Sequence, residues 1–381
     1  MLAHSNGIED EPADESDGFA ASGGILTVDL TALRANYARL RQEATGAEVA
    51  GVVKANAYGL GIEPVAKALW AEGCRTFFVA QLCEALELRP LLPDADIFVL
   101  NGLASGTEEA AARRNIRPVL NSLPQIRAWS ALAAREGGRL PAAIQVDSGM
   151  SRLGLSGQEV EAVAADSALL AGIETRLVMS HLACADEPAH PANKAQLESF
   201  RRLAALLPKA PLSLANSAGV FLGPDFRFDL VRPGIALYGG RPLAGERANP
   251  MRPVVRLEAR IVQLRHVPAG AGIGYGLSAV AEQAMRLATI GIGYADGWPR
   301  RLGNHIAAFA GARALPMVGR VSMDSIILDI GDAPLGDGDL VDLIGQNQDV
   351  DAVAGAADTI SYEILTSLGR RFARRYIGES A

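Results

Sequence analysis

Between Val49 and about Gly239 the chain alternates eight strand-like runs with helix-like runs, and this alternation restricts the fold more than any other feature. Apolar strands that alternate with helices form parallel sheets, because each helical crossover returns the chain to the same end of the sheet. Eight such units predict an α/β fold, a closed (β/α)8 TIM-like barrel. An open doubly wound sheet is the alternative, and the absence of a Rossmann fingerprint disfavours it. The eight runs are VAGVVKA, RTFFVAQ, DIFVLNG, RPVLNS, AAIQVDS, RLVMSHL, PLSLANS and DLVRPGIALYG.

Most of the predicted strands end in a polar residue. In a (β/α)8 barrel the carboxyl ends of the strands form the face that carries the active site. We therefore expect these side chains to gather round one cavity. They are Lys54, Asn101, Asn121, Asp147, His181, Ser217 and Arg232.

The sequence pattern changes beyond about Pro250. Runs such as VVRLEARIVQLRHV and SMDSIILDIGD alternate apolar and polar residues between turns rich in Gly and Pro, which is typical of antiparallel sheets. We expect a barrel over residues 23–245, followed by a mostly antiparallel β domain over residues 246–381. A short strand at residues 25–30 is expected to pack with the C-terminal domain, and the acidic residues 1–22 to form a disordered tail.

Charge and cysteine content exclude several classes of function. The formal net charge is −7, which argues against a nucleic-acid partner because phosphate binding needs a basic surface. The three cysteines lack the spacing of a zinc site, and we predict no metal. No apolar run approaches the roughly 20 residues that span a bilayer, and the N-terminus lacks the features of a secretory signal. We therefore expect a cytoplasmic protein without a membrane partner.

Lys54 is the most informative single residue. An apolar, strand-like run precedes it, which should place its amine at the mouth of the barrel. Partial loss of solvent lowers the pKa of a lysine and favours the neutral, nucleophilic amine. A lysine is more often a solvated surface charge, but this position makes Lys54 a candidate for Schiff-base formation with a carbonyl compound.

The segment KANAYG around Lys54 resembles the pyridoxal-phosphate lysine motif of alanine racemases. Other segments resemble that family in the same order along the chain: VDSGMSRLG, SHLACAD, ANSAG, RPGIALYG, GIGYG, IGYADGW, GRVSMD and SYEILTSLGRR. The resemblance extends from about Ile25 to Tyr376. It implies interconversion of L- and D-alanine with pyridoxal 5′-phosphate as the cofactor, in a homodimer with shared active sites. Both D-alanine biosynthesis and D-alanine degradation remain open as its role.

The resemblance implies two catalytic residues and two residues that support them. Lys54 carries the cofactor as a Schiff base, and Lys54 and Tyr275 are the two bases on opposite faces of the substrate. His181 orients the tyrosine and links it to Arg232, which donates to the pyridine nitrogen of the cofactor. Because an arginine only donates and stays charged, the nitrogen remains an acceptor and the ring is a weaker electron sink, which suits racemisation.

The resemblance also assigns binding residues. Arg152 receives the substrate carboxylate through its planar donor fork. The residues that complete the substrate pocket are Met323 and Asp324. The residues that hold the cofactor, besides Lys54, are Tyr58, Ser217, Arg232, Gly234 and Ile235. The residues that line the entrance are Asp186, Tyr294, Arg300 and Arg320.

The chain departs from the family pattern at four places. YGLG follows the lysine where YGHG is common, and Ala373 takes the place of the usual proline. Arg370 stands at the position of a tyrosine that touches the phosphate in some members. Gln145 stands where some members carry a carbamylated lysine, so that modification is impossible here. A neutral amide donates through its NH2 group, and we therefore predict a bound chloride between Gln145 and Arg152.

Two alternatives remain open. A broad-specificity amino-acid racemase of the same fold would also accept larger amino acids. A non-catalytic pyridoxal-phosphate-binding protein would have a similar barrel alone, and the full β domain that carries Tyr275 argues against it.

Overall fold

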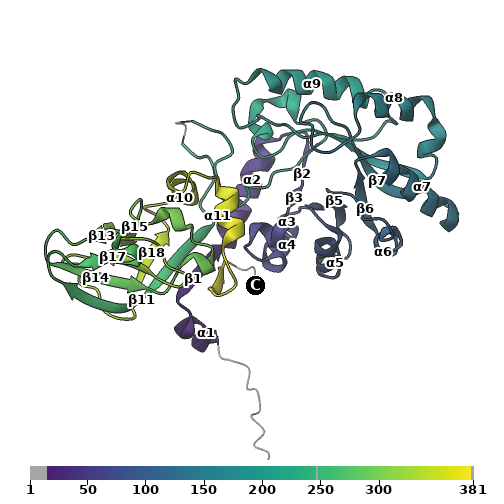
Figure 1. Ribbon diagram of the computed structural model, residues 1–381. Coiled ribbons are helices and arrows are strands. Elements are labelled where there is room, and N and C mark those ends of the chain that lie inside the picture. Colours follow the sequence, from purple (N-terminus) through teal and green to yellow (C-terminus); the bar gives the residue numbers. More distant parts are fainter. Residues whose placement is uncertain (1–14, 246–247, 379–381) are drawn as a thin grey trace, which may run out of the picture. The chain divides into compact units, whose positions relative to one another are not determined.

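The computed structural model describes residues 15–245 and 248–378, and the chain divides into two compact units. The first, which we call the barrel unit, consists of Asp29–Val254, Ser361–Thr366 and the residues from Tyr376 onward. The second, the β unit, consists of the residues up to Val28, Val255–Ile360 and Ser367–Arg375. Each unit therefore combines segments that are distant in the sequence (Figure 1).

Parallel strands close into a barrel, as the alternation predicted. Strands β3 to β9 are hydrogen-bonded in sequence order, and β10 pairs with β2. Two backbone hydrogen bonds of 2.9 Å close the ring. The amide of Arg232 donates to the carbonyl of Ala215, and the amide of Ala50 donates to the carbonyl of Val231. β2 and β3 occupy one strand position, interrupted at Ala50. The strands are β2 Glu48–Val49, β3 Gly51–Val52, β4 Thr76–Val79, β5 Asp96–Val99, β6 Ile116–Leu120, β7 Leu140–Gln145, β8 Ile173–Met179, β9 Leu212–Ser213 and β10 Leu230–Val231.

Apart from the short segment Lys54–Tyr58, which lines a cavity at the strand ends, the helices lie on the outside of the barrel strands (Figure 1). Local capping explains where several of them begin. The Asp29 carboxylate accepts from the amide of Ala32 at 2.9 Å, and Ser156 and Glu159 form a reciprocal capping box. The helices are α2 Leu30–Glu43, α3 Lys54–Tyr58, α4 Ile62–Ala71, α5 Leu82–Leu91, α6 Glu108–Ala112, α7 Leu123–Glu136, α8 Gly157–Ala165 and α9 Pro191–Ala204.

The core of the barrel unit contains several large aromatic side chains. Phe77 and Trp129 are among the largest fully buried residues. Phe78 and Phe98, on the adjacent strands β4 and β5, stack with ring centroids 5.1 Å apart. Burial of each such side chain stabilises the fold by about 2 kcal/mol. The packing fixes the carboxyl ends of the strands, from which the polar residues extend.

Antiparallel strands build the β unit. The main path runs β16-β15-β18-β11-β1-β19, and β14 pairs with both β11 and β17. The N-terminal strand β1 pairs with β11 in the register Leu26↔Leu257. The strands are β1 Gly24–Asp29, β11 Val255–Val267, β12 Gly272–Ile273, β13 Ala279–Val280, β14 Met285–Ile290, β15 Ala307–Ala310, β16 Arg313–Pro316, β17 Ile326–Asp329, β18 Leu340–Ile344 and β19 Ala373–Ile377. The helices are α10 Val350–Ala356 and α11 Ser361–Ser367, whose residues up to Thr366 belong to the barrel unit.

The N-terminal segment differs from the expected disordered tail. Residues 1–14 of that tail lie outside the described residues, but Glu15–Ala21 form the helix α1. The guanidinium of Arg375 lies 4.8 Å from the centre of the Phe19 ring, and Arg260 donates to the Phe19 carbonyl at 2.9 Å. The expectation is therefore wrong for residues 15–21. Phe19 finds partners in the β unit that composition does not reveal.

Two kinds of feature are absent from residues 15–245 and 248–378. No helix there is long and apolar enough to cross a bilayer. No group of three or more His, Cys, Asp or Glu side chains is arranged to hold a metal ion.

Candidate functional site

A cavity of about 470 Å³ opens at the carboxyl ends of the barrel strands. Five of the seven polar residues expected at this face line it, whereas Asn121 and Asp147 hydrogen-bond to the backbone around them. The five are Lys54, Asn101, His181, Ser217 and Arg232. The other polar lining residues are Tyr58, Gln145, Arg152, Asn216 and Tyr362.

Lys54 follows β3 and begins α3, a turn with an unusual backbone. The four residues after it all have left-handed conformations, each of which costs about 1–2 kcal/mol for an L-residue, so the rest of the fold must hold the turn. Part of the support is local: the amide of Gly59 donates to the carbonyl of Ala55 at 2.8 Å, and the Asn56 side chain accepts from the amide of Ile62 at 2.7 Å. The four residues are Ala55 (φ 53°), Asn56 (φ 54°), Ala57 (φ 53°) and Tyr58 (φ 56°).

The amine of Lys54 lies in a cationic environment. Burial lowers its pKa below the ordinary value, and the charge of Arg152 lowers it further. The carboxylate of Glu84 acts in the opposite direction. A larger share of Lys54 is consequently neutral near pH 7 than in free solution, as a nucleophile or a base requires.

Tyr58, Ser217 and Gly234 form a polar cradle on the wall of the cavity. The Ser217 hydroxyl accepts from the amides of Gly234 at 2.8 Å and Ala236 at 3.2 Å. A Cβ atom on Gly234 would collide with the hydroxyl of Tyr58, so only glycine allows this hydroxyl to approach the backbone so closely. Hydroxyl groups and backbone amides that converge on one space suit a phosphate group. These residues and the Lys54 amine therefore fit the cofactor that the sequence predicts.

Arg232 is buried and bound by the barrel backbone. Its Nη2 donates to the carbonyl of Ser180 at 2.5 Å, and its Nη1 donates to the Ser213 hydroxyl. Burial lowers the pKa of Arg232 to about 9, so the group remains cationic near pH 7. Nη2 also lies 3.5 Å from Nδ1 of His181. The pKa of His181 falls to about 3, because burial and then the Arg232 charge oppose its protonation, and its imidazole is neutral.

Gln145 and Arg152 face the same cavity from β7 and the loop that follows it. Gln145 is the last residue of β7 and is buried. Asp147 shapes the loop, because its carboxylate accepts from the amides of Gly149 and Met150, each at 2.9 Å. Arg152, Lys54 and Arg232 are the three basic side chains of the cavity wall besides His181. Positive charge at a cavity wall attracts a carboxylate.

Tyr362 is a cavity residue that the sequence interpretation missed. It lies on α11, and its ring centroid is 6.0 Å from that of Tyr58. We expected Arg370 to replace a tyrosine of the cavity, and that expectation is wrong, because Tyr362 lines the cavity while Arg370 belongs to the β unit. The motif SYEILTSLGRR contains both residues, and only the fold shows which of them returns to the barrel.

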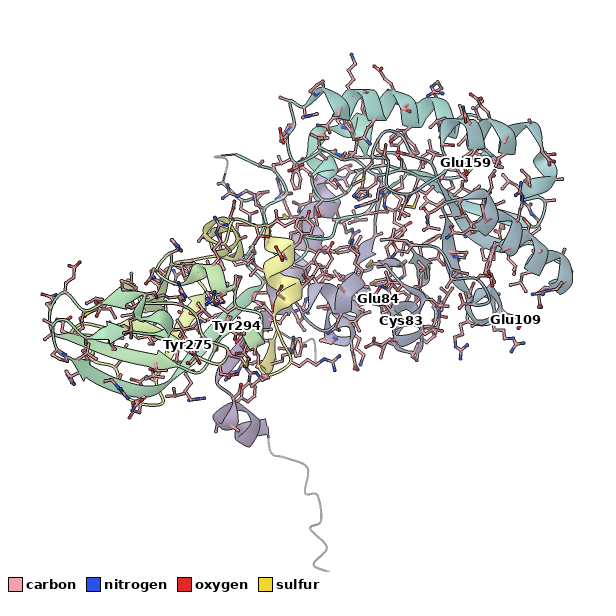
Figure 2. The ribbon with its side chains drawn as sticks, viewed as in Figure 1. Cys83, Glu84, Glu109, Glu159, Tyr275 and Tyr294 are labelled. Atoms are coloured by element: carbon pink, nitrogen blue, oxygen red, sulfur yellow. The ribbon has the colours of Figure 1, made fainter. Side chains whose placement is uncertain are left out.

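Three predicted residues, Tyr275, Tyr294 and Met323, are exposed on the β unit. Their exposed fractions are 69%, 43% and 52%. Figure 2 labels Tyr275 and Tyr294 on that unit. The amide of Tyr294 donates to the carbonyl of Ser322 at 3.0 Å, so Tyr294 and Met323 lie on two linked loops. Large apolar and aromatic side chains that remain exposed on one chain are typical of an interaction surface.

Arg371 joins the same two loops, although the sequence interpretation gave it no role. Its Nε donates to Asp296 and its Nη1 to Asp324, each at 2.7 Å. Asp296 is buried and also accepts from the amide of Gly293 at 2.9 Å. The pair of arginines in SYEILTSLGRR is the signal that could have indicated this residue.

The remaining predicted entrance residues do not line the barrel cavity. Asp186 is exposed on the barrel unit, and Arg300 and Arg320 are exposed on the β unit. The predicted site residues are therefore divided between the two units.

Comparison with known proteins gives consistent matches over nearly the whole chain. Residues 28–242 match the family model described as "Alanine racemase, N-terminal domain", and residues 254–376 match "Alanine racemase, C-terminal domain". A protein of Mesorhizobium japonicum named "Alanine racemase, catabolic" is 57% identical and covers 94% of each chain. The "Alanine racemase" of Brucella canis is 51% identical and covers 96% of each chain.

Two similar solved structures agree with these matches. The alanine racemase from Bartonella henselae with covalently bound pyridoxal phosphate superimposes with a TM-score of 0.90 at 46% identity, covering 94% of this chain and 100% of that one. The biosynthetic alanine racemase from Pseudomonas aeruginosa gives a TM-score of 0.87 at 39% identity, with the same coverage.

Proposed function

This chain belongs to the alanine racemase family, and from that premise we propose how its residues carry out the reaction. It is a racemase that depends on pyridoxal phosphate and interconverts L- and D-alanine. The observation that supports the assignment of its site most strongly is the barrel cavity, which combines Lys54, a phosphate cradle and Arg152.

Lys54 binds the cofactor covalently, and the cradle holds the cofactor phosphate. The hydroxyls of Tyr58 and Ser217 and the backbone amides at Gly234 and Ile235 are the groups that hold it. When bound, pyridoxal phosphate withdraws electrons from the substrate Cα and makes its proton easier to remove. Arg232 would donate to the pyridine nitrogen of the cofactor, and because an arginine only donates, that nitrogen would remain an acceptor.

Two bases on opposite faces of the substrate exchange the α-proton. Lys54 Nζ removes or returns it for D-alanine, and the Tyr275 hydroxyl does so for L-alanine. A tyrosine is a weak base at its ordinary pKa of about 10. His181, linked to Arg232, orients the tyrosine and assists its ionisation through a hydrogen bond.

The substrate carboxylate binds to Arg152, and residues of the β unit complete the pocket. The exposure of Tyr275 and Met323 supports a homodimer in which each subunit supplies these two side chains to the site of the other. Met323 and Asp324 close the substrate pocket. The entrance residues are Asp186, Tyr294, Arg300 and Arg320.

A chloride ion between Gln145 and Arg152 supplies the negative charge that a carbamylated lysine supplies in other members. Gln145 is buried at the cavity wall, and its amide NH2 is a suitable donor. The ion holds the donor fork of Arg152 in place for the substrate carboxylate.

We place the enzyme in the cytoplasm, in D-alanine biosynthesis. The two enantiomers of alanine have equal free energies in water, so a racemase catalyses both directions and the site does not by itself favour formation or degradation. Among the similar proteins, those from Mesorhizobium japonicum and Agrobacterium fabrum are named catabolic, and the structure from Pseudomonas aeruginosa is named biosynthetic.

Borohydride reduction of the holoenzyme tests the attachment of the cofactor. Reduction should fix the cofactor on the peptide that contains Lys54, and peptide mass spectrometry reads its position. The other lysines of the chain, Lys67, Lys194 and Lys209, lie in different segments and serve as internal controls. A label on one of them, or an absence of racemisation with both D- and L-alanine, would contradict the proposed function.

A further inference from the structure

Glu84 supports the left-handed turn after Lys54 from outside the turn. Its Oε2 accepts from the amides of Ala80 at 2.8 Å and Gln81 at 2.9 Å, and it thereby caps its own helix α5. Its other oxygen, Oε1, accepts from the amide of Ala55, the first left-handed residue. Figure 2 labels Glu84 near the start of α5. One carboxylate therefore binds two segments that follow the neighbouring strands β3 and β4.

The contact with Ala55 is not needed to cap α5. In the capping box of α8, Glu159 accepts from the amide of Ser156 at 2.9 Å and forms the same local arrangement without a contact to another strand end. In Glu84 the second carboxylate oxygen makes an additional hydrogen bond, to the amide of Ala55. A carboxylate forms stronger hydrogen bonds than a neutral acceptor, which suits a backbone segment whose conformation is unfavourable by itself.

The carboxylate of Glu84 is negative, whereas the charged side chains that line the cavity with Lys54 are positive. The titratable and charged side chains that line the cavity with Lys54 are Tyr58, Arg152, His181, Arg232 and Tyr362. Burial and the charge of Arg152 lower the pKa of Lys54, and Glu84 raises it. A base that both removes and returns a proton works best when its pKa lies near the working pH, because both its charged and its neutral form are then populated.

We propose that Glu84 is a positioning residue for Lys54: its carboxylate fixes the left-handed turn that presents the lysine and provides the negative charge that balances the cations around the amine. The inference rests on the proposed role of Lys54 and deepens it. Glu84 acts through Lys54 and through the backbone of Ala55, and it takes no part in proton transfer itself.

The experiment compares the apoenzymes of the wild type, Glu84→Gln and Glu84→Ala. An amine-reactive reagent is applied over a range of pH, and the modification of the Lys54 peptide is quantified by mass spectrometry. Amide hydrogen exchange of residues 55–61 is measured on the same proteins. Glu159→Gln controls for loss of a helix cap of the same kind, and Glu87→Gln, at an exposed position of α5, controls for loss of one charge from that helix.

In Glu84→Gln the reactivity profile of Lys54 should shift to lower pH, so that modification at pH 7 is about three- to tenfold faster, the effect expected for one charge at a partly solvated site. Exchange of residues 55–61 should accelerate in both Glu84 variants and in neither control. A wild-type profile together with wild-type exchange in Glu84→Gln would overturn the proposal. Glu84→Gln decides the matter even if Glu84→Ala does not fold. If borohydride labels another lysine, the proposed function fails, whichever result the Glu84 variants give.

Discussion

The guanidinium Nη2 of Arg232 lies 3.5 Å from Nδ1 of His181 in the wall of the barrel cavity. Burial, and after it the charge of Arg232, lowers the pKa of His181 to about 3 in the folded protein, and this shift affects stability. In the unfolded chain a histidine has a pKa of about 6.5. The unfolded state therefore binds more protons below that pH, and the free energy of unfolding falls as the pH drops from 6.5 toward 3.

We predict that His181 accounts for part of the acid sensitivity of the apoenzyme. Between pH 7 and pH 5 its share of the free energy of unfolding should fall by roughly 2 kcal/mol. Urea unfolding at both pH values measures this loss, which should be smaller by that amount in His181→Gln. His266→Gln, a variant of an exposed histidine of the β unit, should behave as the wild type. An equal loss in the His181 variant and the wild type would show that His181 is not held neutral.

Gly234→Ala should weaken binding of the cofactor. The added Cβ meets the hydroxyl of Tyr58, whose ring cannot move freely because it is buried and stacks on Tyr238 at 4.6 Å between centroids. We expect a loss of about 1–3 kcal/mol in stability and faster loss of cofactor absorbance during dialysis. Gly138→Ala is the control, because open space surrounds that glycine. Cofactor retention equal to that of the wild type would argue against a phosphate site at Gly234.

Tyr275→Phe should affect α-proton exchange of L-alanine more than that of D-alanine. The variant retains Lys54, so the α-proton of D-alanine should still exchange slowly with deuterated water, whereas exchange from L-alanine and racemisation should be lost. Proton NMR of each enantiomer follows the exchange. Because Tyr275 is exposed, the substitution should leave the fold intact, and thermal denaturation checks this. Equal exchange of both enantiomers would refute the two-base assignment.

Inactive variants should complement each other if the sites are shared between subunits. In a mixture of Lys54→Ala and Tyr275→Phe chains, half of the randomly formed dimers are mixed, and each mixed dimer has one intact site. About a quarter of the sites should therefore be active. The activity is measured after subunit exchange has been verified by mass spectrometry. Failure to recover activity would indicate a site formed within one chain.

Bromide should replace the proposed chloride. A crystal grown in bromide is expected to show an anomalous peak between Gln145 and Arg152, because bromide accepts the same hydrogen bonds. Gln145→Leu removes the amide donors at a buried position with little change in volume and should abolish the peak. A wild-type crystal without a peak there would disprove the anion site.

The barrel and the location of its active face could be predicted from the sequence. The alternation of apolar runs with helical runs sets the parallel order of the strands, and the residue at the end of each run follows from local periodicity. Lys54, His181, Ser217 and Arg232 could therefore be assigned to one cavity, and the structure brings them together there.

The distant residues that support the cavity follow from long-range packing and could not be predicted from local sequence patterns. Tyr362 reaches Tyr58 because α11 returns to the barrel unit, and Glu84 reaches Ala55 because β3 and β4 are neighbours in the sheet. Such contacts depend on chain crossings and on the left-handed backbone of residues 55–58. Of these four residues only Asn56 has a local preference for that conformation, so the sequence alone does not predict the turn. Local sequence patterns fix the elements, whereas long-range packing selects the side chains that hold a reactive group in place.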